Sequence, residues 1–260
     1  MKKLVIYTCI TGGYDNLYLP EVLCPDADWI CLCDDVSLFD GTEGIWQLRS
    51  LDCPIKGLNS IQRARFAKTN PHLYFPDYEY SLWIDGNIKI VSNSFWDIIS
   101  EKIESGVQFS TMCHLTRDCA YDEALVCLAA GKASFKPLFK AVRYLSSKGF
   151  PRHSGLCESN VILRAHNTKL VRALDEKWSE LILKVCHRDQ LSLPYCLWES
   201  GLEMDCLLPK GINARNSEMF EYNPVHKVSR VDEKRDSFLV WFKKGLLYNA
   251  LELYIKLATR

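Results

Sequence analysis

The segment from Tyr78 to Ile90 constrains the fold more than any other part of this 260-residue chain. Its apolar run at 80–84 predicts a buried strand, and a second apolar stretch follows after a short polar turn. That turn, Asp85-Gly86-Asn87, places a carboxylate and an amide oxygen two residues apart, with a glycine between them. Hard oxygen ligands of this kind suit Mg²⁺ or Mn²⁺. The same three residue types also favour an ordinary β-turn, so both interpretations stay open.

Two earlier apolar runs, at 3–9 and 28–33, also end in glycine or acidic residues. The first run reaches the turn at 11–15, and the second reaches Asp34 and Asp35. In open α/β sheets, ligands bind at the edge where the carboxyl ends of parallel strands meet. We therefore expect an α/β fold with a mostly parallel central sheet flanked by helices, and a ligand site at that edge.

The remaining elements are predicted from apolar periodicity and from capping residues. Further strands are expected at 46–48, 88–91, 107–112, 161–163 and 204–208. Helices are expected at 60–69, 94–103, 118–130, 135–145, 167–184 and 236–260. Ser60 is the expected N-cap of the first helix. The 167–184 helix should bury one apolar face, which comprises Leu170, Leu174, Trp178, Leu181 and Ile182. The polar stretches 153–160 and 211–230 are expected to be loops.

The composition is that of a globular chain, with 48% hydrophobic residues and a formal net charge of zero. A neutral chain is not expected to bind nucleic acid, so any phosphate site must come from a few local basic residues. The first apolar run is too short for a signal peptide, and no stretch approaches the ~18 apolar residues of a membrane span. The twelve cysteines include no CxxC pair. They favour reduced thiols in a cytoplasmic protein over a zinc site or a disulfide scaffold.

Three segments carry charges that allow two interpretations each. Arg65 and Lys68 share one helical face, which is either simply solvated or binds a diphosphate through charge-assisted hydrogen bonds. Asp189 and Gln190 are either ordinary first-turn residues of a helix or part of a site. The amphipathic segment 236–260 either docks on the protein body or lies on an anionic membrane. Its basic residues are Lys243, Lys244, Lys256 and Arg260.

Five blocks occur along the chain in a fixed order: YTCITGGYD, residues 65–72, WIDGNI, Glu158-Ser159-Asn160 and HRDQ. Together they resemble the TOD/MUCI-type glycosyltransferase-like family, once catalogued only as a domain of unknown function. The resemblance covers roughly residues 4–230 and leaves the C-terminal helix outside. It implies a glycosyltransferase domain at 1–230, of the GT-A type and Rossmann-like, followed by a helical extension at 231–260.

The resemblance also implies a nucleotide-sugar site with a divalent metal, Mn²⁺ or Mg²⁺. The implied metal ligands are Asp85, His226 and Asn87, which stands where GT-A enzymes usually have a second Asp. The residues implied for the phosphates or nucleotide are Arg65 and Lys68, with Lys227 on the leaving diphosphate. The residues implied for base and ribose are Thr8, Thr11, Gly12 and Tyr14, with Asp34 or Asp35.

The reacting sugar is expected near Glu158, Asn160, Asp189 and Gln190. If the reaction inverts the sugar, Asp189 or Glu158 would be the base; retention requires no protein base. The expected protein is a cytoplasmic glycosyltransferase that moves a sugar, from a UDP-sugar by analogy with related folds, to a polysaccharide or lipid-linked glycan. Its C-terminal helix would provide peripheral contact with the inner face of the membrane.

Three other functions remain open at this point. Asn87 is compatible with a degenerate fold that binds a sugar or nucleotide without turnover. The acidic turn could also serve a metal-dependent phosphohydrolase, although that function leaves the ITGGYD block unexplained. The C-terminal helix could act as a scaffold for a membrane-bound assembly.

Overall fold

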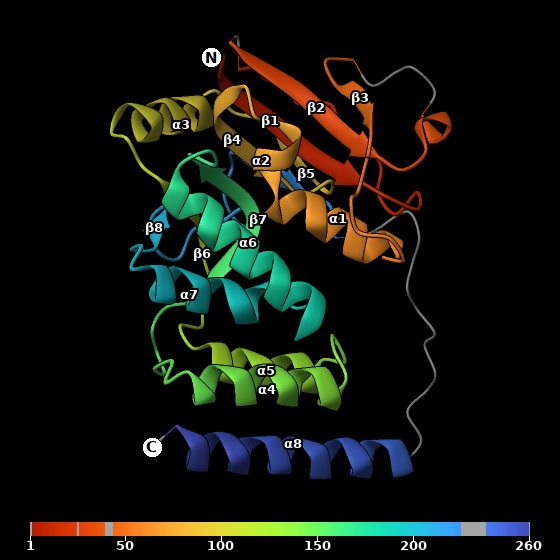
Figure 1. Ribbon diagram of the computed structural model, residues 1–260, viewed down its shortest axis with the longest axis vertical. Helices are drawn as coiled ribbons and strands as arrows, with labels where there is room; N and C mark the ends of the chain where they lie inside the picture. The colour runs from red at the N-terminus through yellow and green to blue at the C-terminus, as the bar shows by residue number, and fades with distance from the viewer. Residues whose placement is uncertain (1, 25, 40–43, 225–237, 260) are drawn as a thin grey trace.

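The computed structural model describes residues 2–24, 26–39, 44–224 and 238–259 (Figure 1). Its strands are β1 (Lys2–Ile10), β2 (Ala27–Cys33), β3 (Gln47–Ser50), β4 (Tyr78–Ile84), β5 (Ile88–Ile90), β6 (Phe109–Cys113), β7 (Cys157–Arg164), β8 (Asp205–Cys206) and β9 (Phe220–Tyr222). Its helices are α1 (Ser60–Thr69), α2 (Pro71–Tyr74), α3 (Ser94–Glu104), α4 (Ala120–Ala129), α5 (Phe135–Ser147), α6 (Lys169–Lys184), α7 (Asp189–Ser200) and α8 (Phe238–Ala258), with a short 3-10 helix at Val36–Leu38.

The central sheet has seven strands in the order β3-β2-β1-β4-β7-β6-β8. The first four strands in that order are mutually parallel, and β8 is parallel to β6. Strand β7 runs antiparallel to both of its neighbours, β4 and β6. The sheet is therefore mostly parallel and flanked by helices, which confirms the predicted α/β fold.

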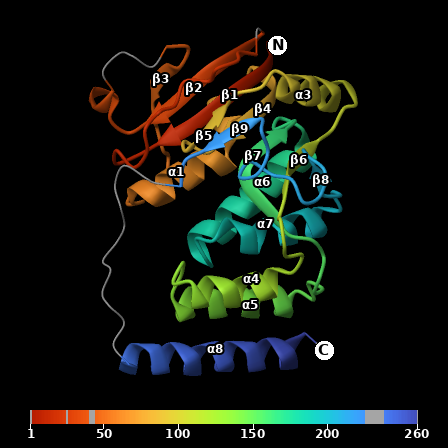
Figure 2. The same cartoon turned by 180° about the vertical axis from the view of Figure 1, so that it is seen from behind.

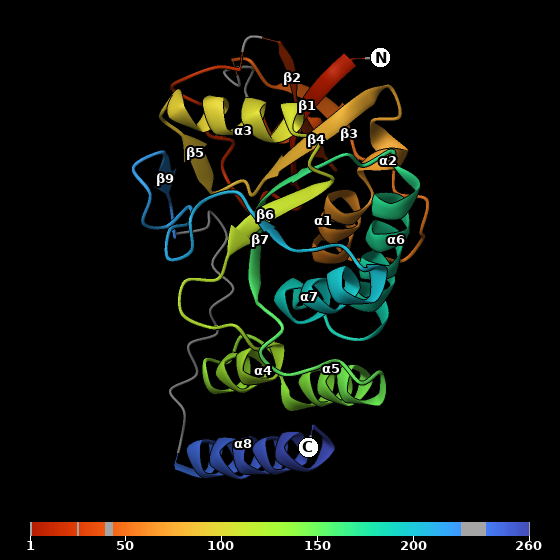
Figure 3. The ribbon, with the colours of Figure 1, turned by 90° about the vertical axis from the view of Figure 1, so that its left-hand side faces the viewer.

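Each face of the sheet has its own hydrophobic core, because the strands in its middle are apolar on both sides. Along β1, Val5 and Tyr7 belong to one core and Leu4 and Ile6 to the other. The first core continues into α1 and α4 to α7, and the second into α3 and the small β5-β9 sheet. Figures 2 and 3 show these two sets of elements on opposite sides of the central sheet.

Two predictions at helix starts are wrong. The N-cap of α1 is Asn59, not Ser60: the Asn59 side chain accepts a hydrogen bond from the Gln62 backbone, and the Gln62 side chain accepts one from the Asn59 backbone. This reciprocal capping box stabilises the earlier start. In α6, Leu170 is 39% exposed, because Val171 is the buried residue of the first turn.

Two stretches predicted to be loops contain strands. Strand β7 begins at Cys157, so Glu158 and Asn160 are strand residues, buried between β4 and β6. Their polarity hides the strand in the sequence, because apolar runs are what reveal a buried strand. Strand β9 is only three residues long, which is too short to show an alternating apolar pattern in the sequence. It forms by pairing with β5.

The C-terminal helix α8 packs on α4 and α5, at the opposite end of the molecule from the N-terminus (Figures 1 and 3). Leu251 and Ile255 are buried there, and the ring centroid of Tyr254 lies 4.8 Å from that of Phe139. Of the two interpretations left open for this helix, docking on the protein body is observed. Among the described residues, no helix is long and apolar enough to cross a membrane.

One pair of cysteines departs from the expectation of reduced thiols. Cys113 and Cys206 form a disulfide, with their Cα atoms 5.6 Å apart. The pairing of β6 with β8 brings together two residues that are 93 positions apart, which the spacing of cysteines along the chain does not reveal. The other ten cysteines, all within the described residues, form no disulfide.

Candidate functional site

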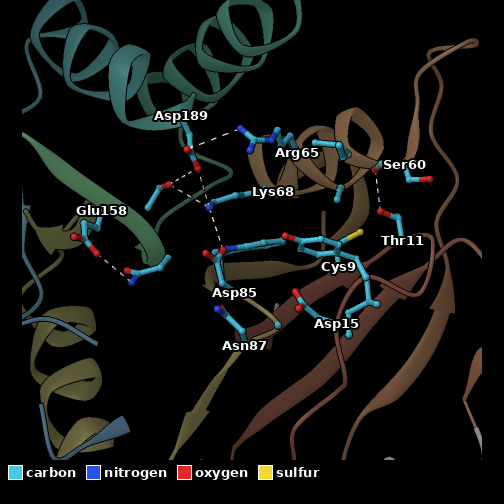
Figure 4. A pocket seen from close by; sticks show the side chains of 18 of the residues that line it. Cys9, Thr11, Asp15, Ser60, Arg65, Lys68, Asp85, Asn87, Glu158 and Asp189 are labelled. Atoms are coloured by element: carbon cyan, nitrogen blue, oxygen red, sulfur yellow. Dashed lines mark hydrogen bonds and ion pairs between the residues drawn. The ribbon is translucent and has the colours of Figure 1, made fainter. Parts of the chain in front are cut away.

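A cavity of about 460 Å³ opens where the carboxyl ends of β1 and β4 meet the beginning of β7 (Figure 4). Because β7 is antiparallel to β4, its first residues lie at the same edge of the sheet as the Asp85-Gly86-Asn87 turn. The amide of Asp85 donates to the carbonyl oxygen of Asn160 at 2.8 Å, which fixes this junction. Helices α1 and α7 contribute the side chains opposite the sheet.

Eleven of the predicted site residues line this cavity: Thr11, Gly12, Tyr14, Arg65, Lys68, Asp85, Asn87, Glu158, Asn160, Asp189 and Gln190. They come from segments far apart in the sequence: the turns after β1 and β4, helix α1, and the starts of β7 and α7. The predicted gathering of these segments is therefore observed.

Three predicted residues lie outside the lining. Thr8 is buried within β1, with 1% of its surface exposed. Asp34 accepts a hydrogen bond from the Gly12 backbone at 3.0 Å and pairs with Arg63 at 3.5 Å, so it supports the cavity-lining turn from behind. Asp35 caps the short 3-10 helix by accepting from Ser37. His226 and Lys227 lie outside the described residues.

The cavity also contains residues that the sequence did not assign to it. The ones that carry charge or can form hydrogen bonds include Asp15, Ser60, Trp83, Ser159, Arg188, Arg215 and Tyr222. Asp15, Trp83, Ser159 and Arg188 could have been assigned from the sequence, since each lies within one of the five blocks. Arg215 and Tyr222 had no such signal, because the pairing of β9 with β5 brings their segment to the cavity.

Lys68 lies at the centre of the polar network, only 5% exposed. Its Nζ donates to Asp85 Oδ1 at 3.1 Å, to Ser159 Oγ at 3.1 Å and to Asp189 Oδ2 at 3.2 Å (Figure 4). The same ammonium group lies 5.2 Å from the centroid of the Trp83 ring. All three donors of this lysine are thus committed to the protein, so it bridges two carboxylates rather than reaching freely toward a phosphate.

The acidic turn presents oxygen ligands that fit Mg²⁺ or Mn²⁺. Asp85 accepts from Trp83 Nε1 at 2.6 Å and from Lys68, and both bonds end on Oδ1. Asn87 donates through Nδ2 to the carbonyl oxygen of Asn223 at 3.0 Å, a bond that does not use its own Oδ1. A Cβ atom on Gly86 would lie 3.4 Å from Asp15 Cβ and 3.5 Å from Asp15 Oδ2, so the Asp15 side chain lies against this turn.

Glu158 is a buried carboxylate and Asp189 a partly buried one, and their surroundings shift their pKa values in opposite directions. Burial alone would raise the pKa of Asp189, yet the charges of Lys68, Arg65 and Arg188 hold it far below its ordinary value. Burial raises the pKa of Glu158, and Arg215, whose Nη1 donates to Glu158 Oε1 at 2.7 Å, only partly opposes this. Glu158 therefore holds a proton more readily than Asp189 does.

Arg65 extends the positive charge of the cavity. Its Nη1 lies 3.9 Å from Asp189 Oδ1 and is buried without a hydrogen-bond partner among the described residues. A buried donor without a partner is costly, because it has lost its hydrogen bonds to water. Its position in the cavity lining makes it available to an anionic ligand.

Comparison with known proteins agrees with this architecture. No curated protein gives a significant match to the chain. A family model described as "TOD1/MUCI70, glycosyltransferase-like domain" matches residues 1–208. The matched segment includes every cavity-lining residue except Arg215 and Tyr222. Since the match covers most of the chain, the protein belongs to the TOD1/MUCI70 glycosyltransferase-like domain family.

Proposed function

We propose that this protein is a metal-dependent glycosyltransferase that moves a sugar from a nucleotide-sugar donor, a UDP-sugar, to a polysaccharide or lipid-linked glycan. The observation that carries the proposal is the cavity itself. Oxygen ligands of Asp85 and Asn87, the cations of Arg65 and Arg188, and the buried carboxylate of Glu158 meet there at the ligand-binding edge of an α/β sheet. Membership of a glycosyltransferase-like family supports the same reaction class.

In this proposal, Asp85 and Asn87 hold Mn²⁺ or Mg²⁺, and Asp15 lies close enough to assist. Such a metal stabilises the charge that develops on a leaving diphosphate. The unpartnered Nη1 of Arg65 would bind the diphosphate by a charge-assisted hydrogen bond. Lys68 would keep Asp85 and Asp189 in place, since its ammonium group donates to both.

Of the two predicted bases, Glu158 is the one we propose for an inverting reaction. A general base is most effective when its pKa lies near the working pH. The pKa of Asp189 is held far below that range by three cations, whereas burial raises the pKa of Glu158. Asp189 is then a positioning residue that accepts hydrogen bonds from Lys68 and from Ser159 Oγ, the latter at 2.6 Å.

Calorimetric titration of UDP, GDP and CDP, each with and without Mn²⁺, tests the donor site. We expect UDP to bind only when metal is present, and Asp85→Ala to abolish that binding. Asp97→Ala is the matched control, because Asp97 is an exposed carboxylate on α3. If GDP or CDP binds in a metal-dependent way instead, the nucleobase of the proposed donor changes. If no nucleotide shows metal-dependent binding, the proposal is contradicted.

A binding module without turnover is the second candidate. The neutral Asn87 and the ion pair between Lys68 and Asp85 at 3.1 Å both lower the negative charge that a metal would meet. Such a module would bind the nucleotide sugar but show neither transfer nor hydrolysis across a panel of acceptors. A phosphohydrolase would instead release phosphate from simple esters, so one set of assays separates the three functions.

A further inference from the structure

A second cluster of ligand-type side chains lies outside the cavity lining, at the start of α4. Cys119, Asp122 and His153 each offer one ligand atom, and these three atoms lie within 4.8 Å of one another. Cys119 and Asp122 are three residues apart at the beginning of α4, and His153 comes from the segment between α5 and β7. We propose that this cluster binds Zn²⁺.

The orientation of His153 supports the proposal. Its Nδ1 lies 2.8 Å from Asp118 Oδ1, a bond that leaves Nε2 for a metal. Histidines that bind zinc commonly donate their other ring N–H to a carboxylate, which fixes the ring and raises its basicity. His153 also has φ of 56°, and among the described residues it is the one non-glycine with positive φ. The surrounding structure therefore holds this residue in a conformation that side chains disfavour.

The set of ligands identifies the class of metal. A thiolate, an imidazole and a carboxylate together suit the borderline-soft Zn²⁺, whereas Mg²⁺ and Mn²⁺ prefer oxygen ligands. Asp122 Oδ1 accepts from Arg152 Nη2 at 2.8 Å, so Oδ2 can face the metal while the arginine orients the carboxylate. This cluster and the acidic turn of the cavity therefore select different ions.

The three side chains differ in exposure, so the ion would have one shielded ligand and a route of entry from solvent. Cys119 is 1% exposed, and its side chain makes no capping hydrogen bond to α4. The side chain of His153 is 56% exposed, so the cluster opens to solvent on the histidine side. A bound ion would tie the segment before β7 to the start of α4. The inference is therefore a site with three protein ligands and one coordination position left to solvent, separate from the cavity proposed for glycosyl transfer.

Titration of metal-free protein with Co²⁺, followed by displacement with Zn²⁺, tests the site. We expect one equivalent of Co²⁺ to give a thiolate-to-cobalt charge-transfer band, which Zn²⁺ then removes. Cys119→Ser should lose the band. Asp118→Asn should weaken binding about 10- to 100-fold, the usual effect of removing an outer-shell carboxylate. His153→Asn should weaken it at least as much, and asparagine tolerates positive φ, so the backbone is retained.

Two control variants make the result specific. Cys53→Ser changes a partly buried cysteine outside the cluster and should keep the band. Asp85→Ala should also keep it, because the proposed donor site is separate. The absence of a thiolate band in the wild type, or its persistence in Cys119→Ser, would overturn the proposal. If Cys119→Ser does not fold, the exposed His153→Asn decides through the same titration.

Discussion

At the scale of single residues, Lys68 determines what the two carboxylates beside it can do. Its ammonium group pairs with Asp85 and Asp189 at 3.1 and 3.2 Å in a nearly buried position. Opposite charges at such distances favour the ionised carboxylate, which is why Asp189 stays charged although it is only partly exposed. Glu158 has a weaker cationic environment and keeps a raised pKa. The three cations around Asp189 thus distinguish it from Glu158, and in the proposed reaction Asp189 is the positioning group and Glu158 the base.

Glu158→Gln tests this division of roles. Glutamine keeps the size of the side chain but cannot accept a proton, so we expect transfer to fall by about 10²- to 10⁴-fold. In the wild type, activity should decline as the pH falls through the raised pKa of Glu158, because only the carboxylate is a base. The pH profile of kcat/KM checks this prediction. A Gln variant that keeps both its rate and its acidic limb would contradict it.

Asp189→Asn is the matched comparison for that variant. We expect it to lower activity without removing the acidic limb of the pH profile. Its carboxylate is already ionised throughout the working range, since its pKa lies far below the ordinary value. Loss of the limb in Asp189→Asn, with retention in Glu158→Gln, would reverse the two roles.

At the scale of elements, the sequence predicts best where burial leaves an apolar run. Strands β1, β2 and β4 are evident for this reason, and the polar ends of these strands locate one edge of the site. The start of β7 was hidden, because Glu158 and Asn160 are polar side chains in a buried strand beside a cavity. Arg215 could not be predicted either, since its place depends on pairing between distant segments. The local sequence pattern reveals individual helices and strands, whereas tertiary packing determines which of them become neighbours.

The start of α1 offers a prediction at this scale. Asn59→Ala removes the side chain that accepts from the Gln62 backbone, so we expect a loss of about 1 kcal/mol in the free energy of unfolding. Ser60→Ala, one position later, should cost less, because Ser60 is not the cap. Denaturant unfolding of both variants measures the difference. A larger loss for Ser60→Ala would place the cap where the sequence first suggested it.

At the scale of the whole molecule, buried neutral histidines make stability depend on pH. Burial lowers the pKa of His166 from 6.5 to about 4, and its Nε2 lies 2.8 Å from the carbonyl oxygen of Phe75. Between these two pKa values the unfolded chain binds a proton that the folded chain does not. Stability should therefore be full above pH 6.5 and fall as the pH drops toward 4. The loss amounts to about 3 kcal/mol from this residue.

Chemical denaturation across that pH range measures the dependence. His166→Gln can keep a donor to the Phe75 carbonyl but does not titrate, so its stability should fall less steeply with acid. Equal slopes for the wild type and His166→Gln would show that burial of this histidine does not contribute.

The far end of the molecule raises the question of what α8 contacts on its outer side. Leu251 and Ile255 are buried against the protein, whereas Leu246, Leu253 and Leu257 are 56%, 59% and 60% exposed. A helix with exposed leucines and several basic residues in its sequence suits an anionic lipid surface. Peripheral contact of this helix with the inner face of the membrane, as expected from the sequence, therefore stays a prediction.

Co-sedimentation with vesicles of anionic and of zwitterionic lipid tests that contact. We expect binding to the anionic vesicles only, and Leu253→Glu to weaken it by at least tenfold, since burying one leucine contributes about 1.5–3 kcal/mol. Leu170→Glu is the control, because Leu170 is an exposed leucine on α6. Failure to bind either vesicle would remove the membrane contact. Concentration-dependent dimerisation that Leu253→Glu abolishes would instead assign the leucines to a second copy of the chain.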